Sequence, residues 1–220
     1  MTETKQDYIV QRSPKWHAQR RGMITASNVG AILGLDPYRT ADDVMRMMVR
    51  DWHGAEPEFT GNVATEWGTF NEEMARGQFA MQHGQPVQEC GFFVSRLYTW
   101  LGGSPDGLIG DNAILEIKCP FGLRNEKIPV FKLISAQPHY YAQVQIQLLV
   151  TGRTTAYFYQ WTPNGDYLQI VPIDDAWLHD NVPKLAQFYR QYCDERETPA
   201  RHLAPKRREI TTLAAQKLID

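Results

Sequence analysis

Apolar residues in the first third of the chain recur at the three- and four-residue spacing of amphipathic helices. In the segment that follows Thr40, for example, Val44, Met47 and Met48 fall on one helical face. Capping residues, a proline at a first helical position and glycines mark where such helices begin and end. These signals predict helices over residues 14–21, 25–33, 41–52 and about 62–83.

After Pro86 the pattern changes to short extended runs that are separated by glycine-containing turns. It predicts strands over residues 87–95, 98–102, 107–109, 113–118, 154–161 and 167–173. A helix is predicted over 135–150 and a last helix over about 174–195. This order of helices and strands indicates an α/β fold in which a mixed central β-sheet is flanked by helices.

The size and composition of the chain favour a single domain. It has 220 residues, of which 43% are hydrophobic, so it can bury a substantial core. We expect one domain over residues 1–220, with a helical part at about 13–84, a sheet core at about 86–173, and a C-terminal helix with a basic tail at about 174–220. The tail carries Arg201, Lys206, Arg207 and Arg208, although the formal net charge is −2. Such a cluster can bind phosphate, and a solvated tail explains it equally well.

Several classes of protein are disfavoured by the sequence. No apolar stretch approaches the roughly 20 residues of a membrane span, and the N-terminus lacks the layout of a signal peptide. The three widely spaced cysteines disfavour a disulfide framework and a cysteine-ligated metal cluster, and the six histidines form no zinc-hydrolase motif. No GxxxxGK[ST] loop occurs, so we expect neither ATP binding nor an ATP requirement. The expectation is a soluble cytoplasmic protein.

Two acidic residues and a lysine stand in neighbouring extended segments of the predicted sheet core. They belong to Ser104-Pro105-Asp106-Gly107 and to Glu116-Ile117-Lys118. Each motif alone has a structural explanation, since Pro-Asp-Gly is a common turn and Glu-x-Lys a common charge pair. Glu116 and Lys118, however, interrupt a run that is otherwise typical of a buried strand, where charges are costly unless they are paired or bind metal. The combination therefore favours a divalent-cation site for phosphodiester hydrolysis.

The same motifs resemble the PD-(D/E)xK nuclease signature, and specifically the lambda exonuclease family with its YqaJ-type viral recombinases. Three further blocks occur in the order found in that family: Trp16-His17 with Arg20 to Ser27, Trp67-Gly68 with Glu72, and Tyr141 to Gln145. The resemblance covers most of residues 16–150 and is weak beyond about residue 175. It implies a restriction-endonuclease-like core.

The resemblance also assigns roles at a metal centre. It implies that Asp106 and Glu116 hold Mg²⁺, that the carbonyl oxygen of Ile117 completes the ligands, and that Glu72 serves a second ion directly or through water. Two ions per site are expected, with Mn²⁺ as a substitute. Lys118 would orient or deprotonate the attacking water, or offset charge on the phosphate.

A second group of residues is implied at the end of the DNA. An arginine offers planar, multi-donor recognition of phosphate, and the helix that begins after Thr25 offers free N–H groups. The resemblance implies that Arg20 and Ser27, with Ser104 as a weaker candidate, hold the terminal 5′-phosphate. It places Gln143 near the scissile phosphate, whereas Tyr140 and Gln145 contact the active-site region or simply pack.

The activity implied by the family is that of a Mg²⁺-dependent, processive 5′→3′ exonuclease acting on the ends of double-stranded DNA. It would release 5′-mononucleotides and leave a 3′ single-stranded overhang for recombination by strand annealing. The resemblance further implies a ring-shaped homotrimer, a single-strand annealing protein as partner, and a phage or prophage gene in a bacterial host.

Two other functions stay open at this point. One is a PD-(D/E)xK endonuclease or a repair nuclease of other polarity, which the segment from Arg20 to Ser27 disfavours because an internal cutter needs no end-phosphate pocket. The other is a DNA-binding module without catalysis. The intact Asp106, Glu116 and Lys118 disfavour it, since a binding module gains nothing from burying such charges.

Overall fold

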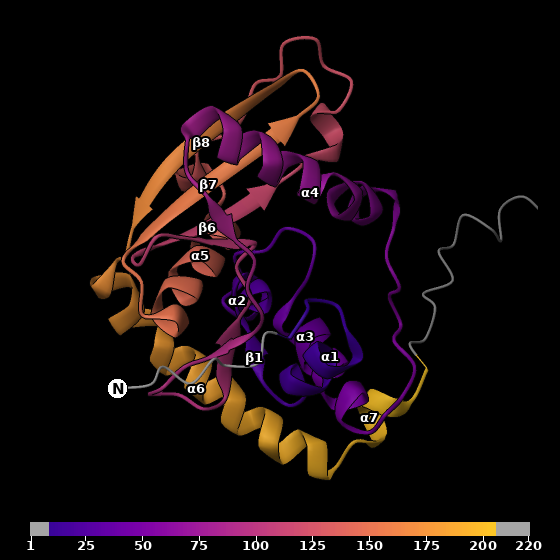
Figure 1. Cartoon of the computed structure of the whole chain (residues 1–220). Helices are drawn as coiled ribbons and strands as arrows, with labels where there is room; N and C mark the ends of the chain where they lie inside the picture. The colour runs from indigo at the N-terminus through magenta and orange to yellow at the C-terminus, as the bar shows by residue number, and fades with distance from the viewer. Residues whose placement is uncertain (1–8, 206–220) are drawn as a thin grey trace, which may run out of the picture.

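Helices dominate the first and the last part of the described residues, and most of the strands lie between them (Figure 1). The computed structural model describes residues 9–205, so Lys206, Arg207 and Arg208 of the predicted basic tail lie outside the described residues. The helices are α1 (Pro14–Arg20), α2 (Ala26–Ile32), α3 (Ala41–Trp52), α4 (Val63–His83), α5 (Pro138–Thr151), α6 (Asp175–Glu197) and α7 (Ala200–Leu203). The strands are β1 (Ile24–Thr25), β2 (Val87–Gln88), β3 (Phe93–Val94), β4 (Leu101–Gly103), β5 (Gly107–Ile109), β6 (Ala113–Lys118), β7 (Thr155–Thr162) and β8 (Gly165–Pro172), with short 3₁₀ helices at Phe121–Leu123 and Ile134–Ala136.

Polar side chains cap α1, α3 and α4 where the sequence predicts their starts, whereas Thr25 before α2 makes no side-chain capping hydrogen bond. Ser13 accepts a hydrogen bond from the backbone N–H of Trp16, and Thr40 forms a reciprocal capping box with Asp43. Asn62 accepts hydrogen bonds from two backbone N–H groups at the start of α4. The predicted helix starts are confirmed because these caps act locally and need no tertiary contact.

The strands form two sheets instead of the single sheet that the sequence predicts. One has three strands in the order β1-β4-β3, and the other has five in the order β2-β5-β6-β7-β8. The larger sheet is mixed, since β6 runs parallel to β7 and antiparallel to β5. The class of fold, helices around mixed β-structure, is confirmed.

The predicted strand over residues 87–95 is wrong in its extent, because the structure splits it into β2 and β3, one in each sheet. Residues 9–11 pack against the chain between β2 and β3. Gln11 donates through Nε2 to the carbonyl oxygen of Cys90 at 3.0 Å. A side chain at Gly91 would come within 2.8 Å of the carbonyl oxygen of Ile9. These contacts engage the backbone that a continuous strand would pair with a neighbour.

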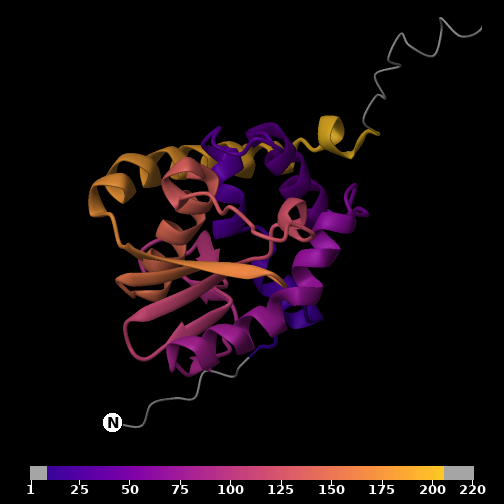
Figure 2. The same cartoon turned by 90° about the horizontal axis from the view of Figure 1, so that it is seen from above.

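Helices cover both faces of the five-stranded sheet, as the view in Figure 2 shows. Alternate residues of β6 therefore meet different helices. Leu115 and Ile117 pack with Phe79 of α4, whereas Ile114 packs with Val144 of α5. Glu116 and Lys118 share the face of Ile114, so the two charged residues lie beneath α5.

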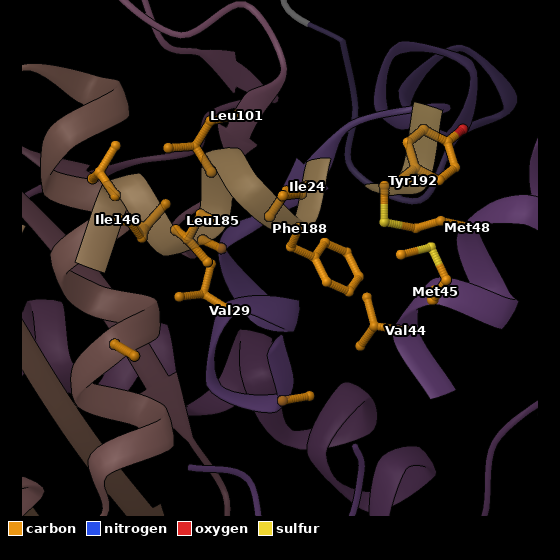
Figure 3. Close-up of a cluster of buried hydrophobic side chains, with 14 of the residues drawn as sticks. Ile24, Val29, Val44, Met45, Met48, Leu101, Ile146, Leu185, Phe188 and Tyr192 are labelled. Atoms are coloured by element: carbon orange, nitrogen blue, oxygen red, sulfur yellow. The ribbon is translucent and has the colours of Figure 1, made fainter. Parts of the chain in front are cut away.

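A second core joins the three-stranded sheet to helices α2, α3, α5 and α6 (Figure 3). Ile24 and Leu101 of the sheet and Val29 of α2 are fully buried in this core. It holds α2, which carries Ser27, against α5, which carries Gln143. The two cores thus bring the N-terminal helices to the same edge of the molecule as Glu116.

Within residues 9–205, no helix combines the length and the apolar character needed to cross a membrane.

Candidate functional site

Asp106 lies between β4 and β5 and faces the end of β6. Its backbone N–H donates to the carbonyl oxygen of Leu115 at 2.9 Å, and its carboxylate oxygen Oδ2 accepts from the backbone N–H of Ile117 at 2.7 Å. These two bonds fix Asp106 beside Glu116. The structure thus brings together the two carboxylates that the sequence pairs.

Glu116 is 2% exposed and accepts hydrogen bonds from three side chains. Its Oε1 accepts from Lys118 Nζ at 2.7 Å and from Gln143 Nε2 at 2.6 Å. Its Oε2 accepts from Gln147 Nε2 at 2.7 Å. The donors satisfy a buried carboxylate that would otherwise be costly, and they fix its orientation.

Gln147 is a site residue that the sequence analysis missed. It follows Gln143 by four residues on α5, and this spacing places both amides on one helical face. The signal was therefore present in the sequence, in the row of glutamines at every second position of α5. The structure separates that row, because Gln145 faces the opposite way.

Lys118 is held as an ammonium by its neighbours. Its Nζ donates to Glu116 and, at 3.3 Å, to Oε1 of Gln143, and it lies 4.6 Å from the ring centroid of Tyr140. Burial is the largest single influence and lowers the pKa of Lys118, but Glu116, Tyr140 and Asp106 together outweigh it, so this pKa lies above that of a free lysine. Tyr140 therefore belongs to the site, as an aromatic contact of the ammonium.

The surroundings of Asp106 favour the neutral form of its carboxyl group, whereas those of Lys118 favour the charged form of its amine. Its pKa lies well above the ordinary value because of burial first, and then because of the negative charges of Glu116 and Glu72. Lys118 and the N–H of Ile117 oppose the shift only in part. Burial and the two neighbouring glutamates therefore favour the neutral form of Asp106 in the absence of a bound cation.

Glu72 of α4 is close enough to act on Asp106 electrostatically, but arginines hold it. Its Oε2 lies 2.5 Å from Arg12 Nη2, and its Oε1 lies 3.7 Å from Arg76 Nη2. In the described part of the chain, no three histidine, cysteine, aspartate or glutamate side chains lie close enough together to enclose a metal ion. Glu72 thus stands outside the pair formed by Asp106 and Glu116.

Arg20 lines a cavity of about 150 Å³ that shares Gln143 and Gln147 with the Glu116 site. The cavity is lined by the predicted phosphate ligands Arg20, Ser27 and Ser104, by Gln143 and Gln147 of the carboxylate site, and by Gln11, Arg12, Trp16, Thr25, Ala26, Phe92 and Gly103. Residues from the first helix, the first strand, the turn before Asp106 and α5 thus meet around one space. The predicted phosphate-binding residues and the predicted metal centre are therefore neighbours in the structure, joined by Gln143 and Gln147.

Aromatic side chains hold the guanidinium of Arg20. Its Cζ lies 3.7 Å from the ring centroid of Trp16 and 6.0 Å from that of Phe92. Trp16 in turn donates from Nε1 to Ser104 Oγ at 2.8 Å. Burial lowers the pKa of Arg20 to about 10, with Asp51 acting against the shift, so the group stays charged at neutral pH.

Gln145 is not brought to the site. It is fully buried, donates to the carbonyl oxygen of Pro172 at 3.0 Å and accepts from the N–H of Asp174 at 2.8 Å. It therefore secures the junction of β8 and α6. Arg12 and Gln11, in contrast, reach the cavity from a segment to which the sequence analysis gave no role.

Comparisons with known proteins agree with this geometry. The structure superposes on the alkaline exonuclease LHK-Exo of Laribacter hongkongensis with a TM-score of 0.72 and 26% sequence identity, over 94% of this chain and 100% of that chain. A phage related exonuclease of Haemophilus somnus shares the fold, with a TM-score of 0.63 and 17% identity over 81% of this chain and 96% of that one.

Sequence comparisons point the same way. An uncharacterized protein of Acanthamoeba polyphaga mimivirus is 25% identical over 161 residues, which are 68% of this chain but only 29% of the viral protein. The YqaJ-like viral recombinase domain model matches residues 15–154, well over half of the chain. The resemblance seen in the motifs is confirmed, and the chain belongs to the YqaJ-like viral recombinase domain family.

Proposed function

We propose that this protein is a metal-dependent exonuclease that enters at the end of duplex DNA and digests one strand in the 5′→3′ direction. Membership of the family, together with its likeness to solved exonucleases, supports a nuclease role. One observation supports digestion from a DNA end in particular. The Arg20 cavity adjoins Glu116, because Gln143 lines the cavity and also donates to the carboxylate of Glu116. A cutter of internal sites has no need for an anion-binding cavity at this position.

The donor atoms around Asp106 fit a hard divalent cation such as Mg²⁺. Asp106 and Glu116 supply carboxylate oxygens, and the pKa of Asp106 is raised by burial first and then by neighbouring negative charges that a cation would balance. The N–H and C=O of a strand residue face the same neighbour, so Ile117 directs its carbonyl oxygen toward Asp106 as well. Mg²⁺ commonly takes one or two carboxylates and completes its shell with water and phosphate oxygens. When bound, it would supply Lewis-acid activation of water and of the phosphate.

The remaining residues of the site orient the reactants. Lys118 is an ammonium in this structure, which favours a role in orienting water and offsetting phosphate charge over a role as base. Gln143 bridges Glu116 and Lys118 and fixes their separation. Glu72 would join the site at a second cation once Arg12 releases its carboxylate.

The cavity would hold the terminal 5′-phosphate of the digested strand. No hydrogen bond or ion pair to another described residue occupies the guanidinium of Arg20, which leaves its donors available to an anion. The hydroxyl groups of Ser27 and Ser104 line the same space. With the terminal phosphate fixed there, the first phosphodiester would reach the carboxylates, and cleavage would release a 5′-mononucleotide and leave a 3′ overhang.

A labelled-duplex assay tests the proposal. Linear duplexes with and without a 5′-phosphate, labelled at either end, are incubated with Mg²⁺ beside a closed circular duplex. We expect the 5′-phosphorylated strand to be digested from its 5′ end, with the circle intact. Cutting of the circle would identify an endonuclease, and earlier loss of the 3′ label would reverse the polarity. The homotrimeric ring, the annealing partner and the phage origin stay predictions from the family resemblance.

A further inference from the structure

The side-chain amide of Gln147 has hydrogen-bond partners for its nitrogen but none for its oxygen. Gln147 is 1% exposed, and both hydrogens of its Nε2 have acceptors: Glu116 Oε2 at 2.7 Å and the carbonyl oxygen of Ser104 at 3.2 Å. Its own oxygen, Oε1, is buried and accepts no hydrogen bond. A buried acceptor without a donor lowers stability, so this position is unfavourable for stability alone.

The orientation of the Gln147 amide is determined by its neighbours. A flipped amide would place Oε1 against the carboxylate of Glu116 and the carbonyl oxygen of Ser104, where both contacts would be repulsive. The observed orientation is therefore the only one that the two acceptors permit. It leaves Oε1 as the atom that lacks a partner.

Gln147 and Gln143 both line the Arg20 cavity and donate to Glu116, and Gln147 also donates to the backbone of Ser104. On one side it touches the carboxylate of Glu116. On the other it lines the cavity of Arg20 and bonds to Ser104, whose hydroxyl group is held by Trp16 beneath the Arg20 guanidinium. Gln147 thus lines a cavity whose guanidinium lacks an anion, while its own buried Oε1 lacks a donor.

We propose that Gln147 is a positioning residue that transmits occupancy of the Arg20 cavity to the carboxylate of Glu116. A phosphate held by Arg20 brings a water molecule or a protonated phosphate oxygen within reach of the amide. Because Oε1 is screened from solvent in the structure, it gains that donor by a small rotation toward the cavity. The amide is rigid and planar, so the rotation also moves the Nε2 donor on Glu116. The inference rests on the proposed function, because it assigns Glu116 to cation binding and the cavity to a terminal phosphate.

Side-chain amide resonances of the ¹⁵N-labelled wild-type protein test this coupling without any change at Gln147. Inorganic phosphate is titrated in the presence of EDTA, and the amide signals of Gln147 and Gln145 are followed. Gln145 is the matched control, since it lies on the same helix and is equally buried but faces the junction of β8 and α6. We expect a saturable shift of the Gln147 signal only, and its loss in Arg20→Ala. A Gln147 signal that stays fixed while the guanidinium signal of Arg20 shifts overturns the inference.

A pair of methionine substitutions tests the consequence for the carboxylate. Gln147→Met and Gln145→Met remove an amide of the same size from the same helix, so we expect similar losses of thermal stability. Only Gln147→Met should weaken Mn²⁺ binding in calorimetry, by about 10-fold, and lower kcat on 5′-phosphorylated ends by about 10- to 100-fold, as loss of a residue that orients a metal ligand does. Gln147→Met should also lower the preference for 5′-phosphorylated over 5′-hydroxyl ends.

The outcomes separate this inference from the proposed function. If the wild-type protein shows neither cation-dependent cleavage nor a preference for 5′-phosphorylated ends, the proposed function fails. If the wild type shows both, and Gln147→Met retains both together with wild-type Mn²⁺ affinity, only the role of Gln147 is overturned. Should Gln147→Met fail to fold, the phosphate titration of the wild-type protein still decides the question.

Discussion

The backbone N–H of Ile117 donates a 2.7 Å hydrogen bond to the carboxylate of Asp106 and so joins the two halves of the acidic motif. The bond is made just before β5 begins, where the ladder between β5 and β6 gives way to the side chain of Asp106. It holds Asp106 beside Glu116 although both carry acidic groups. Part of the electrostatic repulsion between them is expressed as the raised pKa of Asp106.

Asp106→Asn is expected to stabilise the protein in EDTA while abolishing cleavage. An acid whose pKa is raised on folding binds more protons in the folded state, so its ionisation lowers stability as the pH rises from about 4, the pKa of an unfolded aspartate, through the folded pKa. Asparagine avoids this cost and keeps an oxygen for the N–H of Ile117. We expect a gain of roughly 2–4 °C in Tm at pH 8, about 1 kcal/mol for a protein of this size, and almost none at pH 4.

Differential scanning fluorimetry across this pH range measures the effect. Added Mg²⁺ should raise the Tm of the wild type and leave that of Asp106→Asn unchanged. A variant that melts below the wild type at pH 8 in EDTA would show that Asp106 stabilises the metal-free protein, contrary to the electrostatic argument.

Arg20→Ala is expected to remove the preference for 5′-phosphorylated ends. Loss of a charge-assisted hydrogen bond of about 1.5–3 kcal/mol corresponds to a decrease of about 10- to 100-fold in the rate on phosphorylated ends. The rate on 5′-hydroxyl ends should change little. Arg21→Ala is the control, because Arg21 is exposed and lies 3.7 Å from Asp51 at the surface. Equal losses on both kinds of end would disconnect Arg20 from phosphate recognition.

Lys118→Met is expected to abolish digestion without abolishing DNA binding. Methionine keeps much of the aliphatic stem but removes the ammonium that pairs with Glu116 and contacts Gln143. Single-turnover cleavage should fall by about 100-fold or more, within the range for a group that transfers or positions a proton. Fluorescence anisotropy with duplex DNA in EDTA should give nearly the wild-type Kd. Lys184→Met, at the exposed surface of α6, serves as control. Normal cleavage by Lys118→Met would remove this lysine from the mechanism.

Gly30→Ala is expected to separate α2 from α5 and lower stability. A Cβ at Gly30 would lie 2.7 Å from Cβ and 2.9 Å from Cα of His139. Relieving this overlap should cost about 1–3 kcal/mol, which lowers the Tm by roughly 2–10 °C. Gly77→Ala provides the contrast, because a Cβ there meets open space on α4 and alanine favours the helix. Thermal melts with opposite signs for the two variants would support the close packing, and an unchanged Tm for Gly30→Ala would contradict it.

The helices could be predicted from the sequence because their boundaries are set by neighbours in the chain. Thr40 with Asp43, and Asn62 with the first turn of α4, cap the helices wherever those helices pack. The strand from 87 to 95 could not be predicted correctly, since its interruption depends on Gln11 and Ile9, about 80 residues away.

The sequence by itself determined the chemistry of Asp106, Glu116 and Lys118, since the two-residue period of a strand places Glu116 and Lys118 on one face and the family motif relates them to Asp106. Tertiary structure alone decided that Gln147 would join Arg20 and Ser104 at their cavity, and that Arg12 would hold Glu72. The physical reason is that local spacing fixes only which way a side chain leaves its own helix or strand. Which side chains meet is set by the packing of α2 and α5 against the two sheets.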